Sequence, residues 1–89
     1  MSDAGVKERL DFYLSKAKPL FEGVEVCVPK EQKLDKLSKE FEEMAFGYYK
    51  DAKHFKEKGE HLQALLSLEY AEGWLDAGKR LGVFKEKRS

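Results

Sequence analysis

Residues 54–65 read HFKEKGEHLQAL, and the glycine in the middle of this stretch decides how the chain folds. Before it, apolar residues recur every three or four positions from Leu34 to Phe55, which is the pattern of an amphipathic helix. A second helical pattern begins at Leu62. Gly59 suits the position where a helix ends in a left-handed turn. Because so few residues separate the two helices, we expect them to fold back as a tight antiparallel hairpin.

Another helix is predicted upstream of this hairpin. Asp3 suits an N-cap, and apolar residues follow a helical period from Val6 to Phe21. Pro19 removes one internal hydrogen bond, so a kink or an ending is expected there. The predicted fold is therefore all-α, a three-helix up-and-down bundle. Its helices are expected at about 3–22, 30–58 and 60–82.

The segments outside the helices are predicted to be short and irregular. GVEVCVP, residues 23–29, alternates valines, but it has no evident second strand and is expected to be an extended connector. Gly82 is expected to end the third helix, so that Val83 and Phe84 fold back on the core. Residues 85–89, KEKRS, are expected to form a frayed basic tail. The whole chain, 1–89, is predicted to be a single domain.

The charge balance and the cysteine count narrow the class of function. Seventeen basic and seventeen acidic side chains give a net charge of zero, and the isoelectric point is about 6.7. Nucleic-acid binders usually show a basic face and a high isoelectric point, so nucleic acid is not an expected partner. The single Cys27 excludes an internal disulfide. With no apolar run near 18 residues and no signal peptide, we expect a cytoplasmic protein without a membrane partner.

The third predicted helix carries more apolar surface than a three-helix bundle needs. One line along it, which we expect to face the core, contains Leu62, Leu66, Tyr70, Gly73 and Ala77. A second line, roughly opposite, contains Ala64, Leu68, Ala71, Leu75 and Gly82. Apolar or small residues cover roughly 240° of this helix, against about 100° for an ordinary surface helix.

Two interpretations of the second line are open. The first helix could wrap further round and cover it. Alternatively Ala64, Leu68, Ala71 and Leu75 form an interface with a second copy of the chain or with another protein.

Carboxylates on the third helix are the candidates for chemistry. Glu69, Glu72 and Asp76 share one strip, and Asp51 could face them across the hairpin. Converging carboxylates in a helical bundle can hold Mg²⁺ or Mn²⁺. Basic residues follow one turn later, which favours an ion-paired strip over a metal site. No metal and no cofactor is therefore predicted, with these three helix-three carboxylates as the weak candidates for a metal.

A polar groove is the other candidate site. Asp76 has Arg80 one turn on, and Tyr48 and Asp51 could lie across the hairpin. A structural interpretation is an ion pair that sets the helix register, and a functional one is a groove that recognises a ligand or peptide. No nucleophile with a neighbouring base is apparent, so no catalytic residue is predicted.

Residues 48–82, YYKDAKHFKEKGEHLQALLSLEYAEGWLDAGKRLG, resemble the signature of a small archaeal family catalogued as domain of unknown function 357. The stretch from Tyr70 to Gly82 is the most specific part. Glu60 and Glu72 depart from the pattern, where aspartate and histidine are expected. The resemblance implies a three-helix up-and-down bundle and an archaeal source, and it brings no established activity.

The leading functional hypothesis is a non-enzymatic interaction or homo-oligomerising module that uses the apolar surface of the third helix. The alternative is a metal-dependent, nucleotide-processing enzyme that uses Glu69, Glu72, Asp76 and Asp51.

Overall fold

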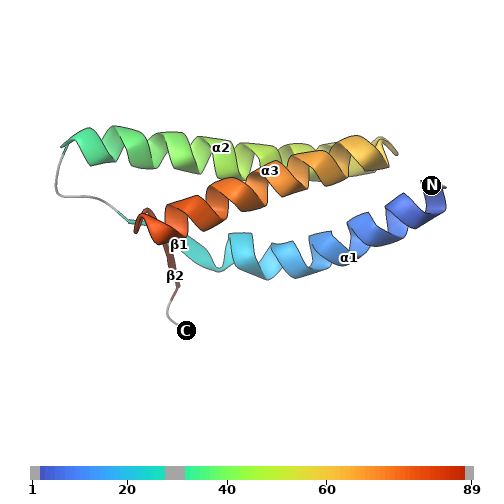
Figure 1. Ribbon diagram of the computed structural model, residues 1–89, viewed down its shortest axis with the longest axis horizontal. Coiled ribbons are helices and arrows are strands. Elements are labelled where there is room, and N and C mark those ends of the chain that lie inside the picture. Colours follow the sequence, from blue (N-terminus) through green and yellow to red (C-terminus); the bar gives the residue numbers. More distant parts are fainter. Residues whose placement is uncertain (1–2, 28–31, 88–89) are drawn as a thin grey trace.

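A helical hairpin forms the centre of the computed structural model, which describes residues 3–27 and 32–87. Its two arms are α2 (Gln32–Glu57) and α3 (His61–Arg80), which run antiparallel along most of their length (Figure 1). The first helix, α1 (Asp3–Glu22), runs in the same direction as α3. The predicted all-α, three-helix up-and-down bundle is confirmed. The molecule is elongated, 48 × 26 × 18 Å.

The hairpin turn is built by Gly59. Its φ angle of 79° lies in the left-handed region, which costs glycine little because it has no Cβ. The Gly59 amide donates to the Lys56 carbonyl at 3.0 Å, and the Glu60 amide donates to the Phe55 carbonyl at 2.9 Å. These two bonds satisfy carbonyls that the end of α2 would otherwise leave unpaired. The turn therefore ends α2 and reverses the chain at once.

Small residues bring the two arms of the hairpin together. Ala45 and Ala52 of α2 and Ala64 and Ala71 of α3 are all fully buried. Because alanine projects only a methyl group, the helices can approach closely and larger side chains can fill the space around the contact.

The first helix closes the other side of the core. Leu10, Ala17 and Phe21 are its buried residues. The helix continues through Pro19 to Glu22, so the expected ending at Pro19 does not occur. The amide of Gly23 donates to the Pro19 carbonyl at 2.9 Å and carries the helical hydrogen bonding past the proline.

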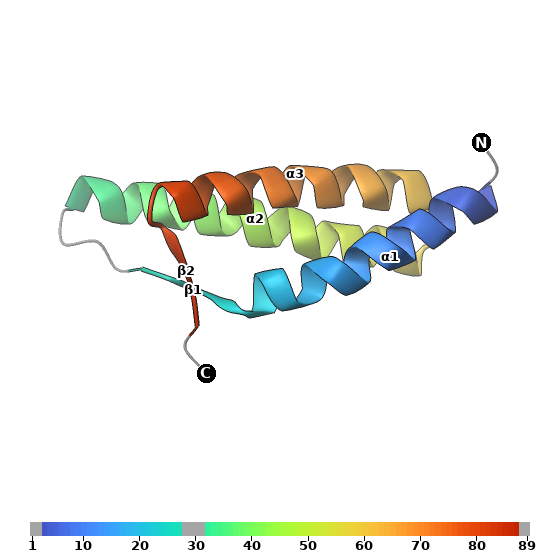
Figure 2. The ribbon, with the colours of Figure 1, turned by 60° about the horizontal axis from the view of Figure 1, so that its bottom comes forward.

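A two-stranded antiparallel ribbon, which the sequence analysis did not anticipate, joins the C-terminal ends of α1 and α3 (Figure 2). β1 (Val24–Val26) pairs with β2 (Phe84–Glu86), with Glu25 opposite Lys85. Residues 24–26 of the expected unpaired connector thus form a strand, and its residues 28–29 lie outside the described residues. Lys85 and Glu86, expected in a frayed tail, form its partner. The remainder of the expected 85–89 tail beyond Lys87, and the expected helix start at 30–31, lie outside the described residues.

The turn at Gly82 brings β2 beside β1. This glycine has a φ of 79°, and the Val83 amide donates to the Gly78 carbonyl at 2.8 Å. The turn directs Val83 and Phe84 back onto the core, where both are buried, as expected from the sequence. Strand pairing follows, because the Val83 carbonyl then accepts a hydrogen bond from the Cys27 amide at 2.8 Å.

Candidate interaction surfaces

The residues predicted to meet a partner lie in the core. Ala64 and Ala71 have no exposed surface, and Leu68 and Leu75 are each 1% exposed. The prediction of an interface along these four residues is wrong. α3 turns this line toward α2 and α1, because its two alanines permit the close helix contact that the opposite, bulkier line would prevent.

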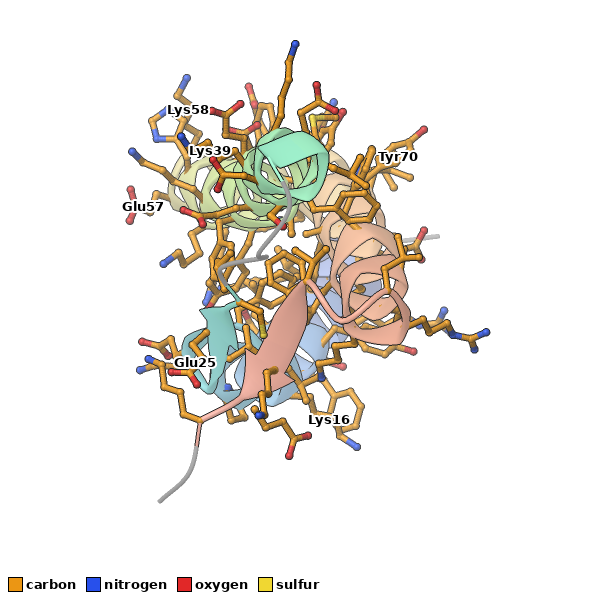
Figure 3. The ribbon with its side chains drawn as sticks, turned by 90° about the vertical axis from the view of Figure 1, so that its left-hand side faces the viewer. Lys16, Glu25, Lys39, Glu57, Lys58 and Tyr70 are labelled. Atoms are coloured by element: carbon orange, nitrogen blue, oxygen red, sulfur yellow. The ribbon has the colours of Figure 1, made fainter. Side chains whose placement is uncertain are left out.

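The large side chains of the line predicted to face the core are instead exposed, whereas its Ala77 is partly buried against the core. Leu62, Leu66 and Tyr70 are 54%, 48% and 63% exposed. Tyr70 projects from the side of α3 that faces away from α1 (Figure 3). Its ring stacks on that of Tyr48 of α2, with ring centroids 5.4 Å apart and planes 27° apart. We call these four residues, Leu62, Leu66, Tyr70 and Tyr48, the hairpin face.

Acidic residues border the hairpin face on α2. A shallow depression of about 260 Å³ beside Tyr48 is lined by Met44 and Gly47 together with Glu43 and Asp51. On α3, Glu69 and Asp76 are exposed. The hairpin face is therefore an apolar strip whose edges carry negative charge.

The predicted polar groove is not assembled. Tyr48 stacks on Tyr70, and this stack fixes the register of the two antiparallel helices. Asp51 lies three residues after Tyr48 on α2, and Asp76 lies six residues after Tyr70 on α3. Because the two helices are antiparallel, these residues lie in opposite directions from the stack. At 1.5 Å of rise per residue, the two carboxylates are about 13 Å apart along the helix axes. Asp76 and Arg80 are both exposed, and within residues 3–27 and 32–87 they make no ion pair with each other.

The three candidate carboxylates of α3 share one side of the helix without forming a metal site. Burial raises the pKa of Glu72, and the negative charges of Asp76 and Glu69 raise it further. Nowhere in the described part of the chain do three or more potential ligand residues gather closely enough to hold a metal ion. The expected ion pairs with the basic residues of the same strip are also not formed among the described residues.

A groove between α1 and α2 is a feature that the sequence analysis missed. The half-buried side chains of Leu14 and Phe46 supply the accessible part of its apolar floor, and the buried rings of Phe21 and Tyr49 complete it. Two adjoining hollows, of about 440 Å³ and 700 Å³, share Tyr49 and Lys53 and so form one continuous groove. Its charged lining consists of Lys18, Lys50, Lys53, Lys56, Lys87, Asp11, Glu22 and Glu57.

Tyr49 stands at the centre of this groove. Its ring stacks on Phe21 with centroids 4.3 Å apart and planes 2° apart, and the Lys53 ammonium lies 4.6 Å from the ring centroid. An ammonium over an aromatic face is attracted by the ring quadrupole. Burial raises the pKa of Tyr49, and the negative charge of Glu22 adds to this effect. The phenol is therefore neutral throughout the physiological range and acts as floor rather than as an acid or base.

Periodicity could not reveal the groove, because its lining comes from α1, β1, α2 and the segment after β2. Five lysines that are scattered in the sequence meet only after α1 has been placed against the hairpin. The one signal in the sequence was the group Lys50, Lys53 and Lys56, which recurs every three residues along one flank of α2.

The fold and these surfaces describe a small helical bundle with an exposed apolar strip on the hairpin and a charged groove between α1 and α2. Residues 12–84 match the model of a family described as "Protein of unknown function (DUF357)". Since the match covers well over half of the chain, the protein belongs to this family, as the resemblance in residues 48–82 predicted. Comparisons with curated proteins and with solved structures found no match. In the described part of the chain, no helix is both long and apolar enough to cross a membrane.

Proposed function

We propose that this protein is a non-enzymatic interaction module that associates with a second copy of itself through the hairpin face. The observation that carries the proposal is the exposure of Leu62, Leu66 and Tyr70 on one line of α3. Side chains of this size that are about half exposed or more and form one contiguous strip are typical of protein contact sites. Tyrosine is also among the residues that contribute most to binding energy at interfaces.

The size of the hairpin is consistent with a dimer contact. The shorter arm of the hairpin, α3, has 20 residues and is about 30 Å long, and two neighbouring helices are together about 20 Å wide. The side of the hairpin therefore measures on the order of 600 Å², which is the lower end of what one partner contributes to an interface of standard size. Leucines 62 and 66 and the tyrosine pair would form its apolar centre.

The acidic border gives this association a recognisable salt dependence. In a symmetric dimer the two borders approach each other, and like charges repel. Glu43 and Asp51 lie beside Tyr48 on this border. Added salt screens the repulsion between exposed charges and also favours apolar burial. Association through the hairpin face should therefore become stronger, not weaker, as salt is raised.

The test is sedimentation equilibrium of the wild-type chain and of the double variant Leu66→Glu, Tyr70→Glu. The wild type should form a dimer at micromolar concentration, and the variant should remain a monomer with unchanged helical content, because both side chains are already exposed. The matched control, Leu68→Glu, places the same charge in the core and should unfold the chain. A wild-type chain that stays monomeric at every salt concentration would refute the proposal.

A further inference from the structure

The groove between α1 and α2 carries an inference that does not depend on self-association. It lies on the other side of the molecule from the hairpin face: Glu57, which lines the groove, and Tyr70 project to opposite sides in Figure 3. The hairpin face can therefore be occupied without covering the groove. The two surfaces also differ in charge, since the border of the hairpin face is acidic.

Charge segregation is the first observation that points to an occupant. The groove contains five lysines and three carboxylates, a net charge of +2, on a chain whose net charge is zero. One carboxylate is already neutralised, because Asp11 Oδ1 lies 3.0 Å from Lys56 Nζ. Lys18, Lys50, Lys53 and Lys87 then face only Glu22 and Glu57. A negatively charged partner would complement this rim.

The apolar floor is the second observation. The half-buried Phe46 is its accessible aromatic ring, and it meets the buried Phe21 ring edge-on with centroids 5.8 Å apart. Leu14 extends the floor toward the N-terminal half of α1. The occupant should therefore present apolar side chains to the floor as well as carboxylates to the rim.

The shape of the groove indicates a helix. It runs between two helices of 20 and 26 residues, and this is where a fourth helix would lie in a four-helix bundle. Helix-in-groove recognition places an apolar stripe of the partner on such a floor and its flanking charges on the rims. We propose that this groove binds an acidic amphipathic helix of another protein, with its apolar side chains on the half-buried Leu14 and Phe46 and its carboxylates toward Lys18 and Lys53.

A nucleic acid fits the same surface less well. Its phosphates would meet Asp11, Glu22 and Glu57 within the groove itself, and like charges repel. A peptide can place neutral or basic side chains at those three points, whereas a phosphate backbone carries a charge at every step.

The experiment uses two synthetic peptides of about 18 residues, five helical turns. Both carry leucines along one face, and these are flanked by glutamates in the first peptide and by lysines in the second. Fluorescence anisotropy with the full chain should show binding of the acidic peptide that weakens with salt, and no binding of the basic one. Lys18→Glu, Lys53→Glu should weaken binding at least about tenfold, because both lysines lie on the rim.

Matched controls separate the groove from net charge and from the hairpin face. Lys36→Glu, Lys58→Glu makes the same charge change outside the groove, at exposed positions on α2 and in the hairpin turn, and should leave the affinity within about twofold. Leu66→Glu, Tyr70→Glu should bind the peptide like the wild type even when it no longer dimerises. If the charge-reversed groove variant loses helical content, Lys18→Gln, Lys53→Gln replaces it and should still weaken binding.

Three results would overturn the proposal. The first is equal binding of the acidic and basic peptides. The second is equal weakening by the groove and control variants, which would indicate a non-specific charge effect. The third is tighter binding of a single-stranded oligouridine RNA through the same lysines, which would make the groove a nucleic-acid site.

Discussion

Gly78 is the residue at which one added methyl group should have the largest effect. It is buried on α3, and a Cβ built on it would clash with Cδ2 and Cε2 of the Phe84 ring. Phe84 is itself only 3% exposed and meets Phe46 edge-on, so its ring has little room to move. The glycine is thus needed for the return of the chain after α3.

Gly78→Ala is therefore expected to destabilise the fold. Overpacking a core typically lowers the free energy of unfolding by about 1–3 kcal/mol. Replacing a helical glycine by alanine raises it by about 1 kcal/mol, so the net effect is destabilising over most of that range. Thermal unfolding followed by circular dichroism should show a lower Tm. Gly73→Ala is the matched control, because the same change at an exposed position with nothing within 4 Å should raise the Tm. A Gly78→Ala chain as stable as Gly73→Ala would contradict the close contact.

The raised pKa of Glu72 predicts that the stability of the fold depends on pH. Burial and the charges of Asp76 and Glu69 raise its pKa in the folded chain, so the native state holds its proton more tightly than the unfolded state. Its contribution to the free energy of unfolding should therefore fall as pH rises from the ordinary glutamate pKa through the raised one, and stay low above it.

Glu72→Gln should remove this dependence and make the chain more stable near neutral pH than the wild type. The measurement is urea unfolding from pH 4 to pH 8, followed by the fluorescence of Trp74, the single tryptophan. Glu69→Gln serves as the comparison, because it removes a charge of the same strip from an exposed position. If both variants changed stability equally, general charge reduction would explain the result and the burial of Glu72 would not.

At the scale of elements, the β1–β2 ribbon shows what helical periodicity cannot detect. Each strand has three residues, and isolated two-stranded ribbons are marginal in water. Here Val24, Val83 and Phe84 are buried against the helices, so the ribbon is stabilised by the core that it covers. Its second strand lies in a segment whose lysines resemble a solvated tail.

Deleting the chain after Gly82 should therefore cost stability well beyond the loss of a tail. The deletion removes the buried side chains of Val83 and Phe84, and loss of a buried phenylalanine alone typically costs about 3–5 kcal/mol. The truncated chain should unfold at a lower urea concentration than the full chain. Lys85→Ala in the full chain is the control and should change little, because Lys85 is exposed. Unaltered stability after truncation would show that β2 contributes nothing to the core.

The helices themselves were predictable. Gly59 and Gly82 end α2 and α3 with positive φ, and the start and end of α1 agree with those read from its sequence. The assignment of the two apolar lines of α3 was not predictable, because both satisfy the helical period. The line with Ala64 and Ala71 is the buried one, because small residues let α2 pack closely against α3.

For the whole molecule, the distribution of charged side chains over the surface is more informative about binding partners than the net charge is. The chain is neutral, yet lysines collect along the groove between α1 and α2 while carboxylates border the hairpin face. The neutral total was one reason for not expecting a nucleic-acid partner. It gave no indication of two surfaces of opposite character, one proposed to bind a second copy and the other an acidic helix.

The sequence by itself determined the number of helices, the ends of α1, the C-terminal ends of α2 and α3 to within two residues, and the antiparallel hairpin, because these depend on local periodicity and on glycines at two turns. Only the tertiary structure decided which line of α3 is buried, that residues 84–86 pair with 24–26, and that five lysines line one groove. Those features depend on contacts between residues far apart in the chain. The helical period specifies which side chains share a face, but not what that face meets.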